Sequence, residues 1–262
     1  MRHSTILATT LLAFAAAAPL QAQDNDFAWR KALARGKSIE IKGINGNVRA
    51  VAATGNEVIV NASKHAKRSD PSTVEIRVIE HADGVTICAV YPTPRNAEHE
   101  NECNSGEGGH MSVNRNDVKV DFTVQVPAGV HANLKTVNGD VEVERLASNV
   151  DATTVNGQVD ISTSGYARAS TVNGSIVAQL GSAAWAGDIE FETVNGSVTL
   201  DLPANLNADV RFQTLNGGIE TDFPVNVVGE LSRRRMKGTI GSGGRDLYAS
   251  TVNGSIRLRR AG

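Results

Sequence analysis

The sequence has little that points to chemistry. Only 4% of its 262 residues are aromatic, two are cysteines, and the formal net charge is −2. A balance so close to neutral gives no reason to expect a nucleic-acid partner. The chain has no cluster of histidines and no assembled Ser-His-Asp set, and GSGG at 241–244 lacks the lysine and helix of a phosphate loop. We therefore expect no catalytic, cofactor-binding or metal-binding residues.

The first residues have the pattern of an export signal. Arg2 supplies a positive charge, Ile6–Ala18 is apolar, Pro19 interrupts the run, and Ala22 is a small residue at the expected cleavage point. The apolar run is too short to span a bilayer. We expect residues 1–22 to be removed, leaving an exported chain in the periplasm or at the cell surface, without a transmembrane span.

Export changes how the two cysteines are interpreted. In an oxidising compartment the pair Cys88 and Cys103 favours a disulfide over two free thiols or a metal-binding pair. The stretch around Cys103 is polar and has the composition of a surface loop. The bond would tie this loop, 88–117, back to the strand at Cys88, and closing about 15 residues contributes roughly 3 kcal/mol in the chain-entropy model.

An internal repeat dominates the mature sequence. The unit TVNG, or TLNG in one copy, recurs at spacings of roughly 20 residues, which is typical of stacked-repeat proteins. The last gap is about twice as long, and we interpret GTIGSGG at 238–244 within it as the remnant of a degenerate copy. A related GINGN lies at 43–47. The repeated pairs are Asn138–Gly139, Asn156–Gly157, Asn173–Gly174, Asn195–Gly196, Asn216–Gly217 and Asn253–Gly254.

Alternating apolar residues flank each Asn-Gly pair. Around Asn195, Ile189 and Phe191 precede the pair, and Val198 and Leu200 follow it. A period of two predicts strands with one buried face, so each unit is strand, corner, strand. Tandem repetition favours an all-β solenoid whose corners stack as ladders, since Asn and Gly accept a positive φ at a corner. The local pattern alone favours Asn-Gly hairpins, which would give an antiparallel array or sandwich as the alternative.

The strand pattern divides the mature chain into two parts. Residues 23–130 have longer and less repetitive strands, ending in a clean alternation at 118–126, and are expected to form an N-terminal β cap that includes the disulfide loop. Residues 131–262 form the TVNG strand-repeat region.

Three stretches together resemble one protein family. They are the run of TVNG units, the opening DFAW…GKSIEIKGINGNV, and the strand DFTVQVPAGV before the first repeat. The chain is similar over about 26–260 to exported bacterial β-strand-repeat domains known as adhesins of unknown function. The resemblance implies a solenoid-like fold and a cell-envelope or surface location, and it implies no reaction. The cysteine-bearing loop and the long gap before the last repeat depart from a minimal member.

Two repeated or clustered features are candidate binding surfaces. The six Asn-Gly pairs could present a polar strip to a periodic polymer, but recurrence favours a structural corner ladder in which the Asn side chains bond one another. The threonines before them fall in phase with buried residues. The run Arg233, Arg234, Arg235 and Lys237 could contact an anionic polymer, with a solvated edge that discourages aggregation as the alternative.

Two sets of residues, one of possible metal ligands and one of carboxylates, are candidates for reactive sites. Glu98, His99, Glu100, Cys103 and His110 contain metal-binding groups, but their spacing matches no defined site. A glycan-cleaving enzyme needs two carboxyl groups roughly 5–10 Å apart in a cleft. Asp140, Glu142 and Glu144 instead lie on the outward phase of one strand, where solvated acids are expected.

These observations favour a protein that is not an enzyme. The leading hypothesis is a cell-envelope or surface β-repeat protein that serves as an adhesin or interaction scaffold, with an unidentified envelope or surface partner, a glycan being one candidate. The first alternative is a periplasmic module that binds an anionic glycan. The second is a carbohydrate-active β-helix enzyme.

Overall fold

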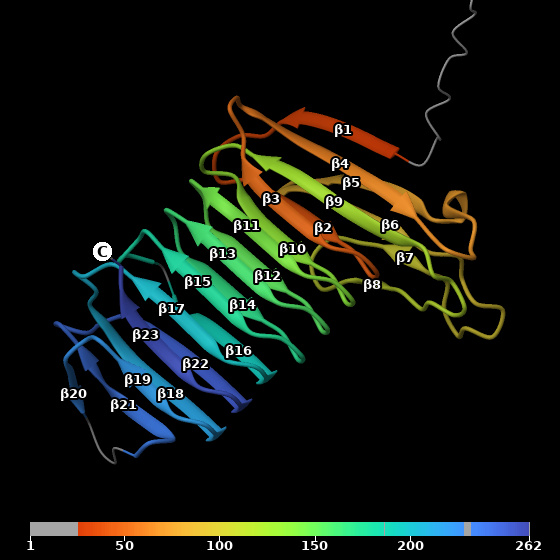
Figure 1. Cartoon of the computed structure of the whole chain (residues 1–262). Helices are drawn as coiled ribbons and strands as arrows, with labels where there is room; N and C mark the ends of the chain where they lie inside the picture. Colours follow the sequence, from red (N-terminus) through yellow and green to blue (C-terminus); the bar gives the residue numbers. More distant parts are fainter. Residues whose placement is uncertain (1–25, 186, 228–231, 262) are drawn as a thin grey trace, which may run out of the picture.

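A computed structural model describes residues 26–185, 187–227 and 232–261, and the predicted signal peptide at 1–22 lies outside them. The chain winds as a β-solenoid: two long sheets lie face to face, and the chain passes from one to the other in every turn, or rung (Figure 1). The repeat strands pair in parallel, so the solenoid is confirmed and the hairpin array is wrong.

Each of the two sheets has its own spatial order of strands. Sheet A contains, from one edge to the other, β1 (Asp26–Ala32), β4 (Glu57–His65), β9 (Lys119–Val126), β3 (Val48–Ala52), β11 (Val141–Leu146), β13 (Val159–Thr163), β15 (Ile176–Leu180), β17 (Val198–Leu202), β23 (Ile256–Arg260) and β19 (Ile219–Thr221). Sheet B contains β20 (Val225–Val227), β21 (Arg235–Ile240), β18 (Ala208–Asn216), β22 (Asp246–Asn253), β16 (Ile189–Asn195), β14 (Ala167–Ser170), β12 (Val150–Thr153), β10 (His131–Lys135), β2 (Ser38–Lys42), β6 (Gly84–Val90) and β5 (Glu75–His81).

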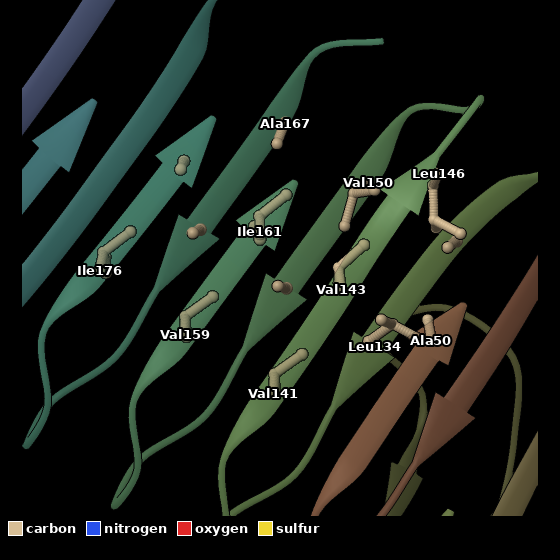
Figure 2. Close-up of a cluster of buried hydrophobic side chains, with 14 of the residues drawn as sticks. Ala50, Leu134, Val141, Val143, Leu146, Val150, Val159, Ile161, Ala167 and Ile176 are labelled. Carbon is tan, nitrogen blue, oxygen red and sulfur yellow. The ribbon is translucent and has the colours of Figure 1, made fainter. Parts of the chain in front are cut away.

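Alternating side chains fill the space between the sheets. On β16, Ile189 and Phe191 are buried, and after the corner Val198 and Leu200 on β17 are buried as well. Figure 2 shows the same arrangement over neighbouring rungs, where Val141, Val159 and Ile176 of sheet A are stacked in register. Because each aliphatic side chain packs on its equivalent in the next rung, the core is one continuous apolar column.

The spatial order of the rungs differs from their order in the chain. The C-terminal rung, β22 with β23, lies between the rung β16–β17 and the rung β18–β19 that precedes it in sequence (Figure 1). At the other end, β2 and β3 lie between β6 and β9 on one side and β10 and β11 on the other. The first and last rungs of the chain are thereby covered on both sides.

Antiparallel strands cover both ends of the stack. At the N-terminal end, β5 pairs with β6, while β4 pairs with β9 and with β1. At the C-terminal end, β21 pairs antiparallel with β18 and β20. The segment 238–244 therefore ends β21 and turns back, so its interpretation as a degenerate repeat copy is wrong. It belongs to a hairpin that pairs with β18, and the short strands β20 and β19 are the edges of the two sheets at this end.

Candidate binding face

The corners of successive rungs are joined by two hydrogen-bond ladders. Each of the six repeat Asn side chains donates from Nδ2 to Oδ1 of the Asn in a neighbouring rung at 2.7–2.9 Å, and the ladder runs from Asn45, which only accepts in it, to Asn216. Each preceding Thr is buried, and its Oγ1 donates to a Gly carbonyl of the neighbouring rung, as Thr154 does to Gly139 at 2.8 Å. The Asn and Thr side chains therefore find their hydrogen-bond partners within the ladders, which is the arrangement that the corner-ladder interpretation describes.

The corner glycines are required for close approach rather than for backbone conformation. None of the six repeat glycines has a positive φ, and among the Asn-Gly corners only Gly46 does. A Cβ built on Gly174 would lie 1.8 Å from the carbonyl oxygen of Gly157, and the other repeat glycines meet the neighbouring rung in the same way. The expectation of a positive φ at these corners is thus wrong, because stacking a backbone on a backbone excludes any side chain there.

The disulfide between Cys88 and Cys103 is present and fastens the long connection from β6 to β9. This connection carries β7 (Glu102–Cys103) and β8 (Gly109–His110) and lies over one end of sheet B (Figure 1). Lys42 on β2 donates to the carbonyl oxygens of Asn104, Gly106 and Gly108 at 2.6–2.9 Å. Burial lowers the pKa of Lys42, although Glu40 opposes the shift.

A buried carboxylate completes the anchorage of this loop. Glu40 is 4% exposed, and its Oε2 accepts hydrogen bonds from Thr86 Oγ1 at 2.8 Å and from the Gly106 amide at 3.0 Å. Lys135 Nζ lies 3.3 Å from Glu40 Oε1 and 2.9 Å from Glu107 Oε1. A buried acid with several partners of this kind is held in place by the fold, so Glu40 is a structural anchor rather than a reactive group.

Beyond the loop, sheet B presents an open polar surface. The side chains that alternate with the buried residues form a row across the strands, one from each rung, because equivalent residues pair in register. We call these residues the outer row; each lies three positions before the Thr of its repeat. In spatial order they are Asn133, Asp151, Arg168, Glu190, Tyr248 and Arg211.

Two hollows lie along the outer row and meet at Arg168 and Glu190. The first, about 290 Å³, extends from Glu107 and Lys135 over β12 and β14 to Glu192. The second, about 750 Å³, lies over β16, β22 and β18. It is lined by Arg168, Asp188, Ile189, Glu190, Arg211, Asp246, Leu247 and Tyr248. Together they form one groove along the axis of the solenoid, with charged groups of both signs on its floor.

Two carboxylates stand side by side in the groove. Glu190 and Glu192 are separated by one residue on β16 and both face away from the core. Burial, followed by the charge and hydrogen bond of Glu190, raises the pKa of Glu192. Within the residues that the structure describes, neither acid has a basic side chain within 4.0 Å, although Arg168 lies on the next strand. No described basic side chain within that distance therefore neutralises the pair.

The basic run 233–237 is divided between β21 and the segment that precedes it. Arg235 and Lys237 lie on β21 beside Gln213 and Arg211, and so continue the polar face of sheet B. Arg233 and Arg234 precede β21, and their carbonyls accept hydrogen bonds from Ile219 and Thr214 of the last rung. All four basic residues are exposed.

The acids considered for metal binding or catalysis are otherwise engaged or dispersed. Glu142 and Glu144 pair with Arg49 of the adjacent rung, and Asp140 Oδ1 accepts from the Gln158 amide at 2.7 Å. His99 and His110 lie edge to face with their centroids 5.8 Å apart. Across the described ranges, no group of three or more His, Cys, Asp or Glu side chains is placed to hold a metal ion.

Comparison with known proteins identifies the family. A model of the Toastrack DUF4097 family matches residues 37–259. The chain belongs to the Toastrack DUF4097 family. A search of the curated proteins found no match to it. No helix in the described part of this Toastrack chain is long and apolar enough to cross a membrane.

Several solved structures are similar to this Toastrack chain at low sequence identity. A candidate cell adhesion protein from Clostridium sporogenes is 10% identical, with a TM-score of 0.47, and the match covers 90% of this chain and 100% of that one. A candidate adhesin from Bacteroides fragilis is 12% identical, with a TM-score of 0.27 and coverages of 90% and 98%. A candidate lipid-binding protein from Parabacteroides distasonis is 10% identical, with a TM-score of 0.26 and coverages of 90% and 97%.

Sequence reasoning missed the outer row, although a signal for it exists. The motif TVNG draws attention to residues that repeat, whereas the groove is built from equivalent positions whose residues differ. Reading three positions before each Thr would have found Arg168, Glu190, Arg211 and Tyr248, and the phase of the alternation shows that they face outward. In this Toastrack chain the variable positions of the repeat carry the candidate site.

Proposed function

We propose that this protein is a non-enzymatic cell-envelope or surface scaffold, an adhesin or interaction protein that holds its partner on the outer face of sheet B. The observation that carries this proposal is the contrast between corners and face. The corners are cross-linked rung by rung through Asn and Thr side chains, which fixes the spacing of the outer row. A surface of this kind offers many weak polar contacts at set intervals, which suits an extended partner.

Rigidity favours binding over chemistry. Side chains on neighbouring strands of a sheet stand about 4.8 Å apart, and the repeated hydrogen bonds leave little freedom to change that spacing. A preorganised surface lowers the entropic cost of holding a flexible partner. Asp140, Glu142 and Glu144, the acids that the sequence suggested for the enzyme alternative, are already paired with neighbouring groups.

The location belongs to the same proposal. We infer export from the segment 1–22, with cleavage after Ala22 and residence in the periplasm or at the cell surface. The disulfide is consistent with an oxidising compartment. The division into 23–130 and 131–262 remains a proposal about composition, since rungs from both parts contribute to the same two sheets.

A binding experiment with matched surface variants tests the proposal. The full chain is expressed with its N-terminal segment, recovered after export, and applied to intact cells, isolated envelopes and immobilised polysaccharides. One variant carries Glu190→Gln and Arg211→Gln on the sheet B face, and the control carries Glu220→Gln and Arg257→Gln, an ion pair on sheet A. We expect the first variant to lose retention and the control to keep it.

Three results would oppose this assignment. Recovery of the protein in the cytoplasmic fraction contradicts export. Equal retention of the two variants contradicts the choice of face. Release of soluble products from any polysaccharide, abolished by changing a single carboxylate, would support the carbohydrate-active enzyme instead.

A further inference from the structure

We propose that the larger hollow, over β16, β22 and β18, is a subsite for an acidic sugar within an extended glycan. This inference rests on the proposed function, because it names the class of partner that the sheet B face would hold. It differs from contact with the basic run at 233–237, since the residues that define it are Arg168, Glu190, Tyr248 and Arg211 of the outer row.

Each of two guanidinium groups is placed to receive its own carboxylate or other anionic substituent. Arg168 lines the hollow and donates from Nε to the backbone carbonyl of Asp188 at 3.0 Å, which restrains the side chain. Arg211 is exposed on β18 and lines the same hollow. Among the described residues, neither has a carboxylate within 4.0 Å, so an incoming anion would not need to displace an existing partner. The planar fork of arginine matches a carboxylate through two parallel hydrogen bonds.

The other lining groups suit the remainder of a sugar ring. Glu190 and Asp246 supply carboxylate oxygens, which accept hydrogen bonds from hydroxyl groups. Tyr248 lies between Glu190 and Arg211 in the register of sheet B. Its hydroxyl accepts a hydrogen bond from Gln213 Nε2, which fixes the ring. An aromatic ring held in this way presents a flat apolar surface to the C–H face of a sugar.

The pattern of charge distinguishes an acidic glycan from other polymers. A strand-to-strand spacing of about 4.8 Å places Arg168 and Arg211 roughly 14 Å apart, with Glu190 and Tyr248 between them. A nucleic acid carries a phosphate at every step and would be repelled by Glu190 and Asp246. A glycan has hydroxyl donors along its whole length and an anion only at some rings. Its carboxylate can therefore meet an arginine while its hydroxyls meet the acids.

The groove gives the ligand a direction. The smaller hollow continues from Arg168 over β14 and β12 toward Lys135, with Ser170 and Thr153 on its floor. A chain of sugars would therefore lie along the solenoid axis and cross the strands, rather than run parallel to them. This orientation predicts that oligosaccharides of several rings bind more tightly than single sugars.

Titration of the purified full-length exported protein with defined oligosaccharides tests the subsite. The probes are tetragalacturonate and its methyl ester, in which esterification removes the charge, together with sialyllactose and lactose, which differ by one acidic ring. We expect each acidic probe to bind at least tenfold more tightly than its neutral counterpart, and its affinity to fall as salt is added. Arg211→Gln should weaken acidic probes about tenfold or more, because a charge-assisted hydrogen bond is lost.

Matched variants locate the site. Tyr248→Ala should weaken acidic and neutral probes alike, whereas Arg211→Gln should weaken only the acidic ones. Arg257→Gln on sheet A is the control and should change affinity less than twofold. Thermal melts of each variant show whether the fold is kept, and Arg211→Lys, which retains the charge without the planar fork, should restore only part of the affinity.

The outcomes separate this inference from the proposed function. If neither acidic probe binds more tightly than its neutral partner, the subsite is wrong even where the protein still adheres to cells or envelopes. If Arg233→Gln with Arg234→Gln abolishes binding while Arg211→Gln does not, the anion contacts the basic run and the hollow is not the site. If the wild-type protein is retained on none of the cells, envelopes or polysaccharides, the proposed function itself is refuted.

Discussion

Replacing Gly174 by alanine tests the reasoning behind the corner ladder. A Cβ at this position would lie 1.8 Å from the carbonyl oxygen of Gly157, and real Cβ atoms essentially never come within 3.0 Å of such an atom. The two rungs would have to separate by about 1 Å or more at the corner, because backbone on both sides leaves no flexible side chain to move. The substitution therefore disturbs the stacking itself and not a local conformation.

The cost follows from the hydrogen bonds that the separation would stretch. At this corner the Gly157 amide donates to Asn173 O at 3.0 Å, Thr171 Oγ1 donates to Gly157 O at 3.0 Å, and Asn173 donates to the side chain of Asn156 at 2.8 Å. At about 0.5–1.5 kcal/mol for each bond, losing three lowers the free energy of unfolding by roughly 2–4 kcal/mol. Urea denaturation followed by far-UV circular dichroism measures this change.

Two neighbouring glycines at the corner between β18 and β19 provide the controls. Gly218 has open space around an added Cβ, so Gly218→Ala should change stability by less than about 1 kcal/mol, in the stabilising direction. Gly217 meets Gly254 O at 1.8 Å but has no further Asn-Gly corner stacked beyond it in the described chain, so Gly217→Ala should cost less than Gly174→Ala. Equal stability of Gly174→Ala and the wild type, or equal losses for Gly217→Ala and Gly218→Ala, would refute the close-approach argument.

Three further predictions concern the loop and two acids. Reducing the disulfide should lower stability by about 3 kcal/mol, which thermal melts with and without dithiothreitol measure. Hydrogen bonds from Ser69 and its neighbours lower the pKa of Asp117 to about 2. The contribution of this carboxylate to the free energy of unfolding is therefore present above pH ~4 and lost toward pH 2. Asp117→Asn should be less stable than wild type at pH 6 and similar at pH 2. Burial and Glu190 raise the pKa of Glu192, so its ionisation destabilises the fold as pH rises. Glu192→Gln should therefore be more stable than wild type at pH 7, by a margin that shrinks at pH 4. A variant that is less stable than wild type at pH 7 contradicts this prediction.

The strands could be predicted because their alternation is a local property of the sequence, whereas the solenoid was predicted from the tandem repetition. Alternation at Ile189, Phe191, Val198 and Leu200 identifies strands, their buried face and the change of phase at the corner. The antiparallel alternative failed because it would leave the six Asn side chains without equivalent partners. Stacked rungs give each one a neighbour with the same geometry.

The order of the rungs could not be predicted from the same pattern. Parallel pairing requires only that two strands present matching side chains, and Ile189 of β16 matches Leu247 of β22 as well as it would match Val210 of β18. The hairpin β20–β21 lengthens the connection enough for the chain to turn back and insert its last rung. A long gap between copies thus indicates an excursion as readily as a degenerate repeat, and only spatial contacts distinguish the two.

The two outer faces of the solenoid show why the functional site should lie on one of them. On sheet A, charged side chains pair with the adjacent rung, as Arg49 does with Glu144, and Arg259 does with Asp201 at 2.6 Å. In the groove of sheet B, Arg168 and Arg211 have no such carboxylate partner among the described residues, although acids stand on neighbouring strands. A scaffold needs only a strand-compatible side chain at these positions, so stability alone explains the paired side chains of sheet A and leaves the two unpaired arginines of the groove unexplained. The proposed recognition of an external ligand would account for that difference, because groups already neutralised by their neighbours would have little to offer it.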